Sequence, residues 1–309
     1  MLGSFTIFAM VAYVLLSSLG IMVNGFIVVL LGREWVRCHQ LSPCDMILIS
    51  LSASRLCLLW LGIIYNFYNF LHHPQYSKEF THPYYGIYFD FLNMLTMWLA
   101  TWLSVLFCVK IANFTHPIFL WLKWRIKGLV PWFLLFSLII SFIFSVLFLV
   151  ANKSLYQAFS GNVTLHGLTR KLEIQYFVPS KLITLLIPFS LFVFSLVLLI
   201  TSLWRHSWRM KHIANSAQDP SFQAHTRALK LLVSFLVLYT LSFMFFFIDA
   251  TFSGFGIIWY WPWQIVIYLF TCIHPFIFIL GNSQLGGALM EFLLLPKTFW
   301  NDKWTSSPS

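Results

Sequence analysis

Charged residues are scarce in this sequence. Asp, Glu, Lys and Arg make up 9% of its 309 residues and hydrophobic residues 60%, whereas soluble domains are roughly a quarter charged. No charged residue lies between Phe5 and Leu31, and roughly 18 or more consecutive apolar residues are enough to cross a bilayer as a helix. The composition excludes a soluble protein and leaves no polar stretch long enough for a second, soluble domain.

Apolar segments with few or no charges recur seven times along the chain. The predicted spans are residues 5–31, 46–70, 85–109, 129–150, 182–204, 230–252 and 258–280. The sequence therefore predicts an all-α protein, a seven-transmembrane helical bundle that forms one domain over residues 1–309. An odd number of spans argues against a transporter built from two duplicated halves.

The positive charges are divided unevenly between the two predicted faces of the membrane. Of the 19 Lys and Arg residues, 13 lie in the first, third and fifth loops and the tail, 5 lie on the opposite face, and Arg55 lies within a span. Because cytosolic loops are enriched in Lys and Arg, we expect an extracellular N-terminus and a cytosolic C-terminus. The same placement explains the net charge of +10 without a nucleic-acid partner.

Cysteine is absent from the predicted extracellular loops. The five cysteines lie in the first cytosolic loop or within spans, at Cys38, Cys44, Cys57, Cys108 and Cys272. We therefore expect no external disulfide, which argues against a rhodopsin-like receptor. The largest outer loop, residues 151–181, instead contains the sequon Asn162-Val163-Thr164, so we expect Asn162 to be glycosylated.

The sequence also lacks the motifs of enzyme chemistry. It contains no H-E-x-x-H, no Gly-rich phosphate loop and no G-x-S-x-G. His206 and His212 share one cytosolic loop without further clustered ligands, so no metal site is expected. We expect neither an enzyme nor a cofactor, and the lack of a ring of charges argues against a channel.

Arg55 stands in the middle of the second predicted span. An arginine at this depth is costly and needs hydrogen-bond acceptors from neighbouring helices. Asn24 in the first span and backbone carbonyls near Pro275 in the seventh are the candidates. Two interpretations stay open, a static clasp that joins helices and a switch whose partners change between two states.

A second group of polar and aromatic residues lies towards the predicted extracellular side, on the third, sixth and seventh spans. A few polar groups converging within an aromatic wall are typical of a small-molecule pocket. The residues that we expect to line it are Phe89, Asp90, Asn93, Asp249, Gln264 and Tyr268. Nearby, Trp259, Trp261 and Trp263 fit an interfacial aromatic belt better than a pocket.

The third cytosolic loop, residues 205–229, is polar and basic and includes the turn signal Asp219-Pro220-Ser221. It is either a solvated connector or a docking surface for a cytosolic partner. The sequence pattern leaves both interpretations open.

Several motifs share their order and spacing with a known family. They are Asn24-Gly25-Phe26-Ile27, Leu48 to Arg55, Leu99 to Ser104, Cys108 to Phe114, Phe119 to Arg125, Pro188-Phe189, Leu198 to Leu203, Gln218 to Ser221, and His274-Pro275-Phe276 with Asn282. Over nearly its whole length the chain resembles the type 2 taste receptors, the G-protein-coupled receptors for bitter compounds. Its sequence is similar to the sequences of the subgroup that contains members 41, 60 and 62.

The resemblance implies a multi-pass plasma-membrane receptor for small, largely apolar bitter molecules. It implies coupling to gustducin or another inhibitory-class G protein, followed by phospholipase C and calcium signalling. The positions matching Asn93 and Gln264 line the ligand pocket in this family, and His274 and Pro275 join Asn24 and Arg55 as candidates for a structural switch. The G protein would meet the inner ends of the third, fifth and sixth spans, where the candidate contacts are Lys110, Asn113, Lys123, Arg205, Arg209 and Lys230.

The chain departs from the family pattern in several places: Phe89 replaces a Trp of many members, and His274-Pro275 replaces a common His-Ser, as in several relatives. The third span ends Phe107-Cys108-Val109-Lys110, and Ser283-Gln284-Leu285-Gly286 replaces a basic stretch after Asn282. The alternative functions are a small-solute transporter or orphan scaffold of the same topology, which would need paired ionisable groups near the midplane, and a membrane enzyme, which would need a catalytic cluster.

Overall fold

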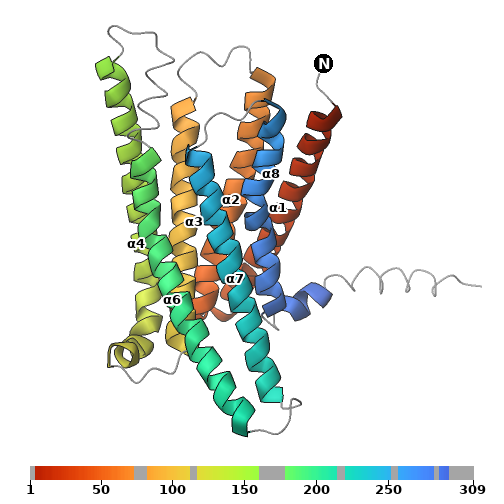
Figure 1. Cartoon of the computed structure of the whole chain (residues 1–309), viewed down its shortest axis with the longest axis vertical. Helices are drawn as coiled ribbons and strands as arrows, with labels where there is room; N and C mark the ends of the chain where they lie inside the picture. Colours follow the sequence, from red (N-terminus) through yellow and green to blue (C-terminus); the bar gives the residue numbers. More distant parts are fainter. Residues whose placement is uncertain are drawn as a thin grey trace, which may run out of the picture.

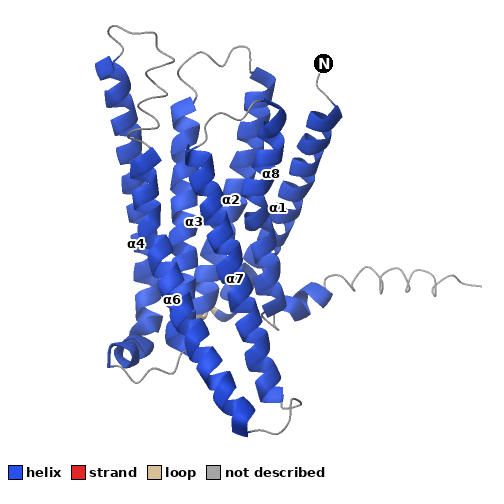
Figure 2. Cartoon of the chain, viewed as in Figure 1, coloured by secondary structure: helices blue, strands red, loops and turns tan. Residues whose placement is uncertain are grey.

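The computed structural model describes residues 4–72, 82–111, 117–159, 178–213, 220–251, 257–281 and 285–291. They form long helices that run side by side as a bundle (Figure 1). The helices are α1 (Ser4–Cys38), α2 (Pro43–His72), α3 (His82–Ile111), α4 (Pro117–Phe159), α6 (Val178–Ile213), α7 (Pro220–Thr251) and α8 (Ile257–Gly281). A short helix at residues 285–291 follows α8, and the described part of the chain contains no strand (Figure 2).

The predicted all-α bundle is therefore confirmed. Six helices carry windows that are long and apolar enough to cross a membrane, and α7 carries the shorter apolar stretch Val233–Phe245. Each predicted span lies within one helix, except that residue 252 falls outside the described residues. The direction in which the bundle crosses the membrane stays a prediction.

The connections between helices are shorter than the sequence predicts. Most of the expected loop at 205–229 is helical, because α6 continues to Ile213 and α7 begins at Pro220. Polar and basic residues are good helix formers, and proline is well tolerated at the first position of a helix, so the apolar boundary did not mark the helix end. Figure 1 shows α6 and α7 extending together past the other helices, at the end of the bundle opposite the N-terminus.

Helix α4 shows the same effect at both of its ends. It begins at Pro117, before the predicted span, and ends at Phe159, inside the predicted outer loop 151–181. Asn162 and the rest of that loop up to residue 177 lie outside the described residues.

Helix α3 is the centre of the bundle. Its apolar window is 67% buried, against 17% for the window of α4, and it contacts α2, α4 and α6. Its contact with α4 is aromatic: the Trp102 ring stacks on Phe133 at 4.1 Å, and its indole N–H donates to Ser137 Oγ at 2.9 Å. α4 therefore lies at the edge of the bundle, fixed to α3 by oriented aromatic contacts of Trp98 and Trp102 with Phe133 and Phe136.

Hydroxyl groups connect α3 to α6. The Thr101 hydroxyl lies 2.9 Å from two carbonyl oxygens, those of Met97 in its own helix and Pro188 in α6. One turn further, Ser104 and Ser195 share a hydrogen bond. Such pairs give two apolar helices a defined register, because a buried hydroxyl without a partner is costly.

Two glycines allow α8 to lie close to α1 and α2. A Cβ placed on Gly20 would lie 2.9 Å from Leu59 Cδ1 and would also meet the Cys272 sulfur. A Cβ on Gly62 would lie 2.6 Å from the Tyr268 ring carbon Cζ. Small residues at helix contacts let backbones approach in a membrane, where packing rather than the hydrophobic effect holds helices together.

Candidate functional site

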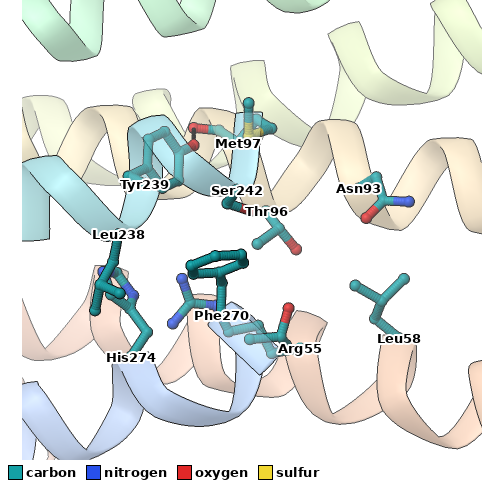
Figure 3. Close-up of a pocket in the computed structure, with 11 residues that line it drawn as sticks. Arg55, Leu58, Asn93, Thr96, Met97, Leu238, Tyr239, Ser242, Phe270 and His274 are labelled. Carbon is teal, nitrogen blue, oxygen red and sulfur yellow. Dashed lines mark hydrogen bonds between the residues drawn. The ribbon is translucent and has the colours of Figure 1, made fainter. Parts of the chain in front are cut away.

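A small cavity lies inside the bundle between α2, α3, α7 and α8. Its volume is about 30 Å³, and its lining residues are Arg55, Leu58, Asn93, Thr96, Met97, Leu238, Tyr239, Ser242, Phe270, Thr271 and His274. Figure 3 shows these side chains converging from helices far apart in the sequence. The cavity combines aliphatic and aromatic walls with a few polar groups, as small-molecule sites do, but a drug-sized ligand needs at least about 300 Å³.

Arg55 enters the cavity from α2. Its side chain is 4% exposed, and its guanidinium points towards His274 of α8, beside the ring of Phe270 (Figure 3). The Arg55 Nε atom and both ring nitrogens of His274 have no hydrogen-bond partner. The basic side chain is therefore held at its position by packing.

The packing around this pair is tight. The imidazole of His274 stacks on Phe235 of α7 with ring centroids 4.2 Å apart. The hydroxyl of Tyr239 donates to the Met97 carbonyl of α3 at 2.9 Å. The wall formed by α3, α7 and α8 is therefore held by ring contacts between α7 and α8 and by a hydrogen bond from α7 to α3.

The structure has no hydrogen bond between Asn24 and Arg55, although the sequence made Asn24 a candidate acceptor for Arg55. The Asn24 amide donates to the Gly20 carbonyl one turn earlier in α1, at 2.8 Å, and its Oδ1 atom has no partner. Pro275, next to His274 in α8, is buried. Of the four switch candidates, the structure brings Arg55 and His274 together around the cavity.

Asn93 lines the same cavity as Arg55, although the sequence assigned the two residues to an outer pocket and an inner clasp. Asn93 is 8% exposed and comes from α3, one turn before Met97. Polar residues from both predicted regions therefore meet in one space.

Gln264 and Tyr268 lie elsewhere, against α1 and α2. Asn66 of α2 is 1% exposed; its amide nitrogen donates to the Tyr13 hydroxyl at 2.8 Å and lies 3.5 Å from Gln264 Oε1. Its Oδ1 atom accepts a hydrogen bond from the Tyr260 hydroxyl of α8. We call Tyr13, Asn66, Tyr260 and Gln264 the Asn66 cluster; it joins three helices, and none of its members lines the cavity.

The sequence matches one protein family over nearly its whole length. The family model described as "Taste receptor protein (TAS2R)" matches residues 1–297. The chain is 52% identical over 306 residues to taste receptor type 2 member 41 of Rattus norvegicus, covering 97% of this chain and 99% of that relative. It is 39% identical over 286 residues to taste receptor type 2 member 60 of Homo sapiens, covering 89% of each.

The chain belongs to the type 2 taste receptor family. It is thus a multi-pass plasma-membrane receptor of the bitter-taste, G-protein-coupled class, which works with a ligand and a G protein and is not an enzyme. These features of the sequence prediction are confirmed.

The other residues expected to line the pocket, and the neighbouring Trp261, differ in burial and in whether the structure describes their side chains. Phe89 is half-buried and packs against the cluster that contains Leu92 and Trp261, and Asp90 is half-buried beside it. Asp249 belongs to α7, and its side chain lies outside the described residues. Trp261 is 1% exposed, so its assignment to an interfacial belt is wrong: its ring packs 5.5 Å from that of Tyr13.

Sequence reasoning missed Asn66 and Tyr239. Asn66 is an amide within the second predicted span, and this was a usable signal because polar side chains in spans point into the bundle. Tyr239 gave no comparable signal, since a tyrosine in an apolar helix is common. Its hydrogen bond depends on which carbonyl of α3 faces it from the neighbouring helix, and the sequence does not show this.

The structure describes the side chains of only some of the residues expected to meet a G protein. Lys110, Lys123 and Arg205 are exposed. Arg209 and Lys230 belong to helices, but their side chains, like the whole of Asn113, lie outside the described residues.

Proposed function

We propose that the receptor binds small, largely apolar bitter compounds between α3, α7 and α8, and then activates a gustducin-type or other inhibitory-class G protein that raises phospholipase C activity and calcium. The observation that supports this proposal is the buried cavity of Asn93, Ser242 and Phe270, in which few polar groups stand among apolar walls. Asn93 is the proposed orienting contact, with Phe89, Asp90, Asp249, Gln264 and Tyr268 as further proposed pocket positions.

Ligand binding must widen the cavity. A space of about 30 Å³ holds one or two small groups, so a bitter compound binds a conformation in which the surrounding helices stand further apart. A ligand that binds the wider form better shifts the population towards it. We propose that this shift moves the inner ends of α6 and α7, where Arg205, Arg209 and Lys230 would contact the G protein together with Lys110, Asn113 and Lys123.

Replacing Asn93 by Ala should raise the agonist concentration for half-maximal calcium response about tenfold. The loss of one buried hydrogen bond to a ligand is worth about 1.4 kcal/mol. The measurement is calcium imaging of cells that express the receptor with a chimeric G protein, challenged with a panel of bitter compounds, with surface receptor quantified by antibody.

The control for this experiment is Ser190→Ala, since Ser190 is exposed and its hydroxyl donates to the Leu186 carbonyl of its own helix. Gln264→Ala separates two roles: lower potency at unchanged thermal stability supports a ligand contact, and lower stability assigns Gln264 to the Asn66 cluster. An Asn93→Ala receptor with wild-type potency for every active compound contradicts the site. A wild-type receptor that reaches the surface and responds to nothing contradicts the function.

Replacing Asn162 by Gln should remove one N-linked glycan and lower the apparent mass of the receptor. We propose that Asn162 lies on the extracellular side, and only a lumenal sequon meets the transferase. Gel mobility with and without a peptide-N-glycosidase measures the change, and Asn113→Gln is the matched control from a sequon on the predicted cytosolic side. Unchanged mobility of Asn162→Gln, or a shift in Asn113→Gln, argues against the proposed glycan and orientation.

A further inference from the structure

Arg55 is a buried cation without a described counter-charge. It is 4% exposed and lines the central cavity, and no acidic side chain is among the lining residues. The acidic residues whose side chains the structure describes are Glu34, Asp45, Asp90 and Glu291, and none of them lines the cavity. Asp90, one turn before Asn93 on α3, is the one nearest in sequence to a lining residue. Asp249 lies ten residues along α7 from Tyr239, which is about 15 Å at the rise of an α-helix.

Several other polar groups of the cavity can donate a hydrogen bond to a bound anion, and each also carries an acceptor atom. Asn93 offers an amide, His274 offers a ring N–H without a partner, and Ser242 and Thr271 offer hydroxyls. The nearest backbone acceptor on α3, the Met97 carbonyl, already faces the hydroxyls of Thr101 and Tyr239. The cavity therefore presents a positive charge and several groups that can donate to an anion, and no carboxylate is among its lining residues.

A guanidinium stays charged in proteins, so Arg55 cannot escape its burial by losing a proton. An unpaired charge in a dry helical bundle is strongly unfavourable unless an opposite charge or several acceptors face it. From the unpartnered Arg55 Nε atom, the unpartnered His274 ring and a lining that has donor groups but no carboxylate, we propose that the cavity is a binding site for a small anionic group held by Arg55, with chloride as its occupant in the unliganded receptor.

The size and shape of the cavity favour a compact anion. Its volume of about 30 Å³ is well above the roughly 10–15 Å³ that one water needs and far below the roughly 300 Å³ of a drug-sized site, which suits a small ion in this conformation. Arg55 and His274 lie on one side, and Thr96 and Ser242 lie across from them (Figure 3). An ion at this position would connect α2, α3, α7 and α8 through one charge. The anion site goes beyond the proposed response to bitter ligands and does not depend on it.

The test uses the purified full-length receptor in detergent micelles, with sodium chloride replaced stepwise by sodium gluconate at constant ionic strength. Chloride should raise the Tm of the wild-type receptor by about 2–4 °C with a saturating dependence. Radiolabelled chloride should bind at about one ion per receptor and be displaced by bromide but not by gluconate. R55Q should lose both effects, and K123Q, which removes an exposed cation of α4, should keep them.

T271V keeps Arg55 and provides a second variant if R55Q does not fold: it should weaken chloride binding several-fold. Benzoate separates the two sources of an anionic group. Stabilisation by benzoate but not by chloride, lost in R55Q, keeps the anion site and assigns its occupant to a carboxylate-bearing ligand. A wild-type Tm independent of both anions, with no saturable chloride binding, overturns the proposal whether or not bitter compounds activate the receptor.

Discussion

Replacing Gly62 by Val should lower the free energy of unfolding of the receptor by about 3 kcal/mol, the upper part of the range for overpacking a buried contact. Added carbons at this position collide with the Tyr268 ring, since a Cβ would lie 2.6 Å from its Cζ atom. Tyr268 is buried and packs edge-on against Tyr13 with ring centroids 5.6 Å apart, so it has little space in which to move. The purified variant should unfold about 6–12 °C below wild type.

The matched control is Gly32→Val in α1, where an added Cβ meets nothing within 4 Å. It should leave the Tm almost unchanged. The double variant Gly62→Val with Tyr268→Ala should be more stable than the sum of the two single effects predicts, because the collision is removed. Equal Tm values for Gly62→Val and Gly32→Val would show that α8 does not pack on α2 at this level.

Replacing Asn66 by Leu should cost a similar amount, about 3 kcal/mol. The substitution removes the hydrogen-bonding group that the fully buried Tyr13 hydroxyl shares with the Tyr260 hydroxyl and the Gln264 side-chain oxygen, which are half-buried. Each buried polar group left unsatisfied costs about 1–3 kcal/mol. Thermal unfolding of the purified receptor measures the loss, and the fraction of receptor at the cell surface should fall with it.

The Tyr13→Phe variant distinguishes a shared network from simple packing. In the double variant with Asn66→Leu, an apolar pair replaces both hydrogen-bonding partners, so the combined loss should be smaller than the sum. Ser190→Ala serves as the control and should change stability by less than about 0.5 kcal/mol. Additive effects of Tyr13→Phe and Asn66→Leu would mean that these side chains stabilise the bundle independently.

The helices of the receptor could be predicted from sequence because each span carries its signal locally. The ends of those helices could not, since the apolar pattern reports the membrane boundary whereas α4, α6 and α7 continue past it. Pro220 shows the difference: read as a turn signal, it is the first residue of α7.

The functional site was partly predictable for the same reason. Depth along a span is available from sequence, and it singled out Arg55 and Asn93 as polar groups within the bundle. The direction in which a side chain points around its helix is not fixed by depth in an apolar span, because every face is hydrophobic. Gln264 therefore shared a predicted depth with Asn93 but faces Asn66 instead of the cavity.

The hydrogen bond from Tyr239 to the Met97 carbonyl gives α7 the geometry of a lever. Ser242, on the cavity side of this fulcrum, lies three residues away, or about 4.5 Å along the helix, whereas Pro220 at the far end lies about 28 Å away. If α7 tilts as a rigid rod about Tyr239, a displacement of the short arm is multiplied about sixfold at the tip of the long arm. In that case a compound bound at the proposed site that pushed Ser242 aside by half an ångström would move Pro220 by about 3 Å.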